Sequence, residues 1–391
     1  MSDAPMITFP LLRLGRLQLG PGLRALQPGS AASGLVVTAA VPVPDSSAEP
    51  QYAWDVAWAD AAREAGRLGA DQATAQALAT GAGDAFVGGT RIVVAARGEV
   101  LLARWLAPGA AASSVRVGPL PHLQEVAAAA ARRPAYVVLL ADRKGADVIA
   151  HSGGDQLPAQ RFPAGDRPGA QSDPHPGRPP AQHHGPRHVT DSEPESGGQQ
   201  NAEFIAGRVS QAAHSVGAHI VLGTGDQHIL DAVEGHLPGS IGPVTAIAGG
   251  RQADGLDDHL SAAIGAALDK ITAAAASAVA DRVASLTEGP GPAAVRGISA
   301  VAEQLAEQQV AVLLVAADLA HGTGAGASYR IGSRPTEFLV GDAGPGVEVP
   351  LEDGLVWAAL HQDAIVVQLP DRAGPLAGEP AAALLRRGPA A

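Results

Sequence analysis

Cysteine is absent from the 391-residue sequence. Its absence excludes disulfides, thiol nucleophiles and thiolate metal sites, and it fits a reducing compartment. Aromatic residues are also scarce, at 3% against 46% hydrophobic residues overall. The core must therefore be built mainly from Ala, Val, Leu and Ile, which favours helices that approach one another closely.

Basic residues are fewer than acidic ones: the sequence has 27 Lys and Arg and 39 Asp and Glu, which gives a formal net charge of −12. This balance argues against coating nucleic acid through a global positive field, so any RNA contact should be local. The start, MSDAPMITFPLLRLGRLQLG, has no basic region followed by a clean apolar run, and no apolar segment reaches the roughly 18 to 20 residues of a membrane span. We expect a soluble cytoplasmic protein.

The length of the chain exceeds one ordinary core and favours two or three domains. We expect three α/β domains, over residues 1–131, 132–255 and 256–391, the last of them an α/β/α sandwich. In the first, QYAWDVAWADAAREAGRLG carries Trp54 and Trp58 at helical spacing, which favours packing in the core over stacking on bases. TRIVVAARGEVLLARWL is predicted to form two strands joined at Arg97-Gly98.

The middle domain opens with AYVVLLADRKGADVIAH, two apolar runs about a Gly-containing turn. A helix with Ile205, Val209 and Ala212 on one face, a strand in AHIVLGTGDQ, a short helix and a strand in PVTAIAG follow, and this alternation predicts a mainly parallel sheet. Residues 152–191 are dense in Pro and Gly and almost without aliphatic residues. Such a segment buries too little surface to offset its ordering entropy, so we expect a mobile arm.

The third domain opens with an Ala-rich helical stretch over residues 257–286, which is expected to connect the domains. AAVRGISAVAEQLAEQ has apolar residues at helical intervals from Val295 to Leu305 and is predicted to be a helix. VAVLLVAADL is expected as a central strand, and TEFLVG and AIVVQL as further strands around a helical GLVWAALHQ.

The tripeptide Gly197-Gly198-Gln199 matches the working end of factors that release nascent chains from ribosomes. Catalysis would need this motif at the tip of a loop, but the flanking TDSEPES carries three carboxylates that repel RNA phosphates. Ser192 and Glu195 form a capping box around Pro194, which is tolerated in a first helical turn. The pattern predicts a helix that begins here and contains the tripeptide, at a cost of about 1 kcal/mol for each glycine relative to alanine.

Three segments, in this order, carry a resemblance to a known family: RRPAYVVLLADRKGADVIAHSGG, QNAEFIAGRVSQAAHSVGAHIVLGTGDQHILDAVEGHLP and VRGISAVAEQLAEQQVAVLLVAADL. The chain resembles the bacterial homologues of archaeo-eukaryotic release factor one and Pelota, most closely the actinobacterial branch related to the ribosome hibernation factor Balon. The resemblance runs from about residue 35 to the C-terminus, and none of the segments is a catalytic signature. In related chains Asn201 falls within the helix after the arm, which makes the tripeptide here an ordinary helical segment.

The resemblance implies three α/β domains in the release factor and Pelota architecture. The first would face the decoding centre, the second would extend its arm towards the peptidyl-transferase centre, and the third would meet a translational GTPase. The implied partners are the ribosome, through 16S and 23S rRNA at the A site, and elongation factor Tu as the candidate GTPase. No cofactor and no membrane are implied.

Candidate RNA contacts lie in the arm: Arg161, Arg167, Arg178, His183, His184, Arg187 and His188. Arginines pair with phosphates, and both residue types stack on unpaired bases. A solvated loop without a role is the alternative interpretation of the same residues. The adjacent histidines have no cysteine and no carboxylate at helical spacing, so no metal site is predicted.

Two further segments have two readings each. GTGDQ, residues 223–227, could cradle an anion but lacks a full phosphate-binding fingerprint, which favours a simple tight turn. HGTGAGASYRIGSR, residues 321–334, reads as a partner-docking loop or as a flexible connection.

The favoured function is a ribosome hibernation factor that occupies the A site and inhibits translation without catalysis, so no catalytic residue is expected. The alternative is a release-factor-like peptidyl-tRNA hydrolase that uses Gly197, Gly198 and Gln199. A metabolic α/β protein with a ligand in the GTGDQ turn is the third hypothesis.

Overall fold

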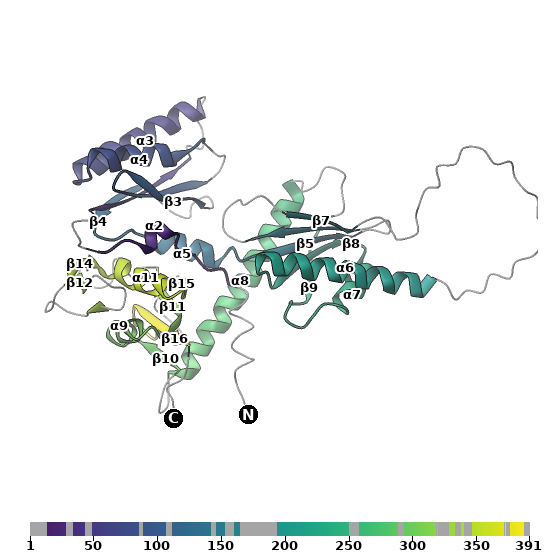
Figure 1. Ribbon diagram of the computed structural model, residues 1–391. Helices are drawn as coiled ribbons and strands as arrows, with labels where there is room; N and C mark the ends of the chain where they lie inside the picture. Colours follow the sequence, from purple (N-terminus) through teal and green to yellow (C-terminus); the bar gives the residue numbers. More distant parts are fainter. Residues whose placement is uncertain are drawn as a thin grey trace, which may run out of the picture. The chain divides into compact units, whose positions relative to one another are not determined.

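The computed structural model describes most of the chain in two compact units (Figure 1). The described residues are 14–28, 34–43, 49–85, 89–106, 112–141, 146–152, 160–164, 194–249, 258–287, 293–317, 319, 328–332, 338–339, 346–370, 372 and 376–386. Unit 1 combines Met1–Arg133 with Thr272–Ala391, and unit 2 is Pro134–Ile271.

The N-terminal sheet of unit 1 is antiparallel, with strand order β3-β2-β1-β4. Its strands are β1 (Val36–Pro42), β2 (Thr90–Ala96), β3 (Glu99–Leu106) and β4 (Ser114–Gly118). The predicted β2–β3 hairpin is confirmed. It turns at Arg97 and Gly98, whose φ angles of 56° and 77° have the positive sign that a type I′ hairpin turn requires at both positions.

Two helices, α3 (Pro50–Arg67) and α4 (Gln72–Ala82), cover one face of this sheet. Trp54 and Trp58 from α3 are 0% and 2% exposed, and the Trp54 indole N–H donates to the carbonyl of Gly83 over 2.9 Å. Their predicted role in the core is therefore confirmed.

The second large sheet of unit 1 has the order β10-β16-β11-β15, in which β11 runs parallel to β15 and antiparallel to β16. The strands are β10 (Ala294–Arg296), β11 (Val310–Ala316), β15 (Ile365–Leu369) and β16 (Ala381–Leu385). A smaller sheet has the order β13-β12-β14, from β12 (Ser328–Ile331), β13 (Phe338–Leu339) and β14 (Val347–Pro350).

One predicted helix begins later than expected. The helical pattern starts at Val295, but that residue lies in β10, which pairs with β16. Gly297, with φ of 85°, separates β10 from helix α9 (Ile298–Ala306). A residue with positive φ cannot be part of a right-handed helix. The helix therefore begins after Gly297, although the apolar spacing starts at Val295.

Helix α11 (Leu351–His361) lies in the main core of unit 1, and its first ten residues are all buried. This core joins one face of the N-terminal sheet, helices α2 (Pro21–Arg24) and α5 (Gln124–Ala131), and the α9 side of the second sheet. The opposite face of the second sheet packs against the C-terminal part of helix α8 (Asp258–Leu286). Helices therefore lie on both faces of that sheet.

Unit 2 contains one five-stranded sheet of order β7-β6-β5-β8-β9. Its strands are β5 (Tyr136–Ala141), β6 (Ala146–His151), β7 (Gln160–Ala164), β8 (Ile220–Gly225) and β9 (Val244–Ala246). β5, β8 and β9 are parallel, whereas β6 and β7 run antiparallel to their neighbours. The sheet is thus mixed rather than mainly parallel, because β5, β6 and β7 pair in sequence order before the first helical crossover.

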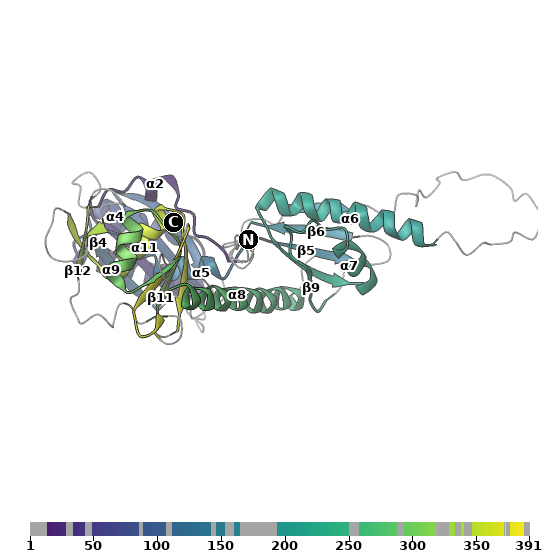
Figure 2. The same ribbon diagram turned by 90° about the horizontal axis from the view of Figure 1, so that it is seen from below.

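Helices cover both faces of this sheet (Figure 2). α6 (Pro194–Val216) and α7 (Gln227–Glu234) pack on one face, and the predicted apolar stripe of Ile205, Val209 and Ala212 is confirmed as buried. The N-terminal part of α8 packs on the other face.

Helix α8 differs from the expectation that no apolar segment is long enough to span a membrane. Residues His259–Leu286 of this helix are long and apolar enough, by length and composition, to cross a membrane. Its apolar residues have protein partners, since Leu260 and Leu268 pack in unit 2 and Val279 and Val283 pack in unit 1.

The helices, strands and several sheets confirm the multidomain α/β class. The structure places Gln160–Ala164, inside the segment expected to be a mobile arm, in strand β7. The boundaries between the units follow Arg133 and Ile271, whereas the predicted domain boundaries follow residues 131 and 255. The division into three domains stays a prediction.

Candidate functional site

The tripeptide Gly197-Gly198-Gln199 lies inside helix α6, which begins at Pro194. This position confirms the prediction from the capping pattern, while Ser192 itself falls outside the described residues. Interior helical residues engage their backbone N–H and C=O groups along the helix. The tripeptide therefore does not occupy a loop tip of the kind that would carry Gln199 into a crowded pocket.

The solvent-exposed side of α6, away from its buried stripe of Ile205, Val209 and Ala212, carries a surface feature that the sequence analysis missed. Phe204 is 42% exposed, and the guanidinium carbon of Arg208, one turn later, lies 5.4 Å from the centroid of its ring. An exposed aromatic ring with a cation over it is suited to stacking on a base and pairing with a phosphate. The apolar spacing did not separate Phe204 from its buried neighbours, because adjacent helical residues can both face a sheet, as Ile205 and Ala206 do here.

Of the predicted RNA contacts, the structure describes the backbone of Arg161, which lies in β7 opposite Ile149 of β6. The other six lie outside the described residues: Arg167, Arg178, His183, His184, Arg187 and His188. Their proximity to one another is untested, and their role stays a prediction. The end of the segment 321–334 partly forms strand β12, and the rest of that segment is outside the described residues apart from Gly332.

The GTGDQ segment is a tight turn between β8 and α7, as favoured from the sequence. Asp226 caps α7 by accepting a hydrogen bond from the backbone N–H of His228 over 3.0 Å. The carboxylate occupies the helix N-terminus, where an anionic ligand would otherwise bind, and it would repel one. Gly225 has φ of 118°, and a Cβ atom there would lie 1.7 Å from the carbonyl oxygen of Ala141.

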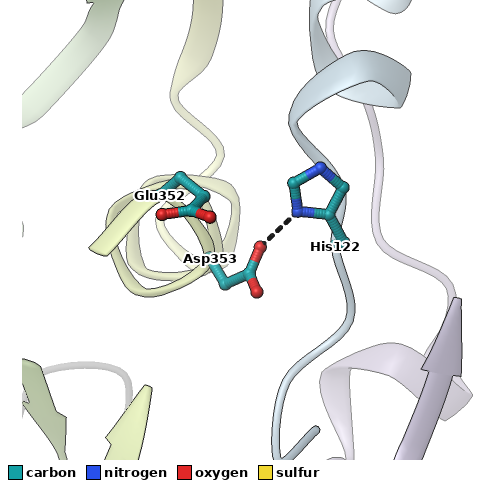
Figure 3. Close-up of side chains that lie close together, drawn as sticks. All are labelled: His122, Glu352 and Asp353. Carbon is teal, nitrogen blue, oxygen red and sulfur yellow. Dashed lines mark hydrogen bonds and ion pairs between the residues drawn. The ribbon is translucent and has the colours of Figure 1, made fainter. Parts of the chain in front are cut away.

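A buried cluster of ionisable side chains lies in unit 1 and was not predicted. His122, in the segment before α5, presents its Nδ1 2.6 Å from Asp353 Oδ1 and its Nε2 2.9 Å from Glu125 Oε2. Figure 3 shows His122 and Asp353 pointing toward one another, with Asp353 projecting from the first turn of α11. The backbone N–H of His122 donates to the Thr38 hydroxyl of β1 over 3.0 Å.

Glu352 and Arg116 complete the cluster. Glu352 is 8% exposed and lies beside Asp353 in α11, and its Oε1 is 3.4 Å from an Arg116 guanidinium nitrogen. Arg116 projects from β4, and its side chain is 46% exposed. Three carboxylates therefore face two basic side chains, and all five come from unit 1.

The surroundings of His122 favour its protonated form. Burial alone would lower the pKa of His122, but the hydrogen bonds with Asp353 and Glu125 outweigh burial and raise it to about 9. Burial is the largest single influence on the pKa of Glu125 and would raise it, but the hydrogen bond and the charge of His122, together with the charge of Arg116, outweigh burial and lower this pKa. Burial raises the pKa of Asp353, so the two carboxylates differ in direction. An ionised Glu125 at Nε2 requires an N–H there, which favours the imidazolium.

His122, Glu352 and Asp353 also place atoms of metal-ligating type within 4.8 Å of one another, as one group found in the described part of the chain. Both ring nitrogens of His122 are already engaged by carboxylates. The imidazolium of His122 thus occupies the position that a metal ion would take between these carboxylates. The cluster is an ion-pair network whose charges are paired within unit 1.

The amino-acid sequence of residues 135–287, less than half of the chain, matches the family described as bacterial archaeo-eukaryotic release factor family 2. The curated proteins include no significant match.

Several solved structures are similar at low identity. A model of ribosome-bound archaeal Pelota and ABCE1 is 15% identical, with a TM-score of 0.37, over 91% of this chain and 91% of that chain. Archaeoglobus fulgidus Pelota is 15% identical, with a TM-score of 0.32, over 77% of this chain and 80% of that one. The archaeal termination factor aRF1 is 11% identical, with a TM-score of 0.20, over 98% and 97%.

The matched residues cover unit 2, with its five-stranded sheet and helices α6 and α7, and continue to the end of helix α8. Residues 135–287 of this chain are thus similar to the bacterial archaeo-eukaryotic release factors of family 2.

Proposed function

We propose that this protein binds the ribosome and acts there without catalysis. The family match over residues 135–287 supports the ribosome as partner, because release factors work on ribosomes. The observation that carries the non-catalytic part is the position of Gly197, Gly198 and Gln199 inside helix α6.

A helical Gln199 is poorly suited to hydrolysis. To orient water against an ester, its backbone would have to leave the helix, and the buried stripe of Ile205 and Val209 resists displacement of the turns that follow. Peptide release from this position would thus require local unfolding before any chemistry, which lowers the population of a competent state.

The proposal in full is a cytoplasmic hibernation factor, of the branch related to Balon, that occupies the A site under stress and inhibits translation. Its arm arginines and histidines contact rRNA, and elongation factor Tu is a candidate partner. Phe204 and Arg208 add an exposed aromatic and cationic pair on the helix that follows the arm. The arm residues and the Phe204–Arg208 pair support local contacts with RNA in a chain whose net charge is −12.

The substitution Gln199→Ala tests the proposal. We expect wild type and the variant to co-sediment equally, within about twofold, with ribosomes from stationary cells at low salt, because the side chain is not used in binding or chemistry. Neither protein should release peptide from peptidyl-tRNA on those ribosomes. Gln200→Ala, one residue further along the same helix, is the matched control for any general effect on α6.

Two outcomes would contradict the proposal. If wild type cleaves peptidyl-tRNA and Gln199→Ala binds but does not cleave, the protein is a release-factor-like hydrolase. If the wild-type protein fails to co-sediment with ribosomes at low salt, the ribosome is not its partner.

A further inference from the structure

We propose that His122, in its protonated form, fastens helix α11 to the N-terminal sheet of unit 1. We call His122 together with Asp353 and Glu125 the latch. Through its ring, His122 holds the first turn of α11, and through its backbone N–H it holds Thr38 in β1. One residue thereby connects segments more than 200 positions apart in the sequence, since Asp353 follows His122 by 231 residues.

The latch pairs a buried negative charge with a positive one. Glu352 and Asp353 are 8% and 6% exposed in an otherwise apolar core, and an unpaired carboxylate in such a place costs several kcal/mol. Two basic groups face them, His122 from the segment before α5 and Arg116 from β4. Arg116 contacts Glu352, so Asp353 depends on the imidazolium of His122.

The same geometry makes the attachment depend on a proton. The ionisable groups facing His122 are Glu125 from α5, Asp353 and Glu352 from α11, and Arg116 from β4. Loss of the His122 proton would leave one ring nitrogen without an N–H to donate, opposite a carboxylate that can only accept. The contact would then turn from attraction to lone-pair repulsion, and the α11 end of the unit would loosen from the N-terminal sheet.

The direction of the pH dependence follows from the pKa of His122, which is raised to about 9 in the folded protein from an ordinary value of 6.5. Below pH 6.5 both folded and unfolded chains hold the proton, so the stabilisation is complete. Between pH 6.5 and 9 the unfolded chain loses it first, so stability declines. Above pH 9 the contribution is gone.

Thermal unfolding followed by tryptophan fluorescence tests the latch, because all four tryptophans lie in unit 1: Trp54, Trp58, Trp105 and Trp357. Between pH 6.5 and 9, the unfolding equilibrium constant of wild type should rise up to about 300-fold more than that of His122→Gln, which cannot titrate. Below pH 6.5 the two profiles should run parallel.

His361→Gln is the matched control. His361 also lies in α11, but burial lowers its pKa, so its titration falls on the acid side. This variant should keep the alkaline decline of wild type. Parallel profiles of wild type and His122→Gln across the alkaline range would overturn the latch.

Two further measurements keep the inference testable if His122→Gln does not fold. An NMR titration of wild-type His122 should give a pKa well above 6.5, and a value at or below 6.5 would reject the latch. EDTA should leave the unfolding midpoint of wild type at pH 7 unchanged. A fall in the midpoint would mean that a metal ion, rather than a proton, holds the cluster together.

Hydrogen exchange at pH 7 separates a latch from general destabilisation. In Asp353→Asn, protection should fall most in β1, β4 and α11, and less in β11 at the centre of the second sheet. A uniform loss over unit 1, or none, would count against the assignment.

Discussion

Replacement of Gly225 by alanine should unfold unit 2 selectively. The new Cβ would lie 1.7 Å from the carbonyl oxygen of Ala141 and 2.8 Å from its carbonyl carbon, so the ends of the parallel strands β5 and β8 would have to separate. The φ angle of 118° adds strain for any residue other than glycine. We expect a loss of about 3 kcal/mol or more, among the largest effects of a single methyl group.

The tryptophans give this prediction an internal reference. Since all four lie in unit 1, fluorescence reports that unit, whereas far-ultraviolet circular dichroism and limited proteolysis also report unit 2. The variant should lose part of its helical signal and become sensitive to protease within residues 134–271. Its fluorescence transition should stay close to that of wild type. Unchanged protease resistance of unit 2 would contradict the close packing of β5 on β8.

Gly207→Ala is the matched control, with an effect of opposite sign. Gly207 is an exposed position in α6, and a Cβ atom there would meet nothing within 4 Å. Alanine should stabilise the helix by up to about 1 kcal/mol because glycine loses more conformational freedom on folding. The same substitution in the same unit therefore separates a steric demand from a helix preference.

Local signals in the sequence were sufficient for several elements. Pro194 beside a capping box predicted the start of α6, and Arg97-Gly98 predicted the hairpin, because caps and turns depend on residues within a few positions. Trp54 and Trp58 were assigned to the core from their spacing alone. These features need no knowledge of the rest of the chain.

Features that depend on distant pairing were missed. β16, from a run of small apolar residues near the C-terminus, enters the second sheet between β10 and β11, and nothing in its own sequence specifies those neighbours. The latch has the same origin, because His122 precedes a polyalanine helix without any recognised motif. One signal was available: Glu352 and Asp353 open a helix that is apolar on every side, and such carboxylates need a buried basic partner.

The arm over residues 152–191 stays a prediction, apart from Gln160–Ala164, which the structure places in β7. The strand β7 forms because Gln160–Ala164 pair with the open edge of β6. Pairing of that kind depends on a partner strand, and a short polar segment carries little sign of it.

The second prediction with a large effect concerns this arm and rests on the proposed ribosome binding. Replacing Arg161, Arg167, Arg178 and Arg187 together with glutamine should remove most of the salt-dependent affinity for ribosomes. Each arginine that neutralises a phosphate of a single strand contributes about 0.7 to the slope of log affinity against log salt concentration. Four such contacts correspond to roughly a 50-fold change in affinity between 50 and 200 mM salt, which the variant should no longer show.

A charge-matched variant distinguishes a local contact from net charge. Arg16, Arg63, Arg67 and Arg132 are exposed in unit 1, and their replacement by glutamine makes the chain more acidic by the same amount. If RNA is held through the arm, this control should keep the wild-type salt slope, while the arm variant loses it. Equal losses in the two variants would show that affinity follows overall charge. The arm would then have no special part in binding, although a chain with a net charge of −12 has little general attraction to phosphate to lose.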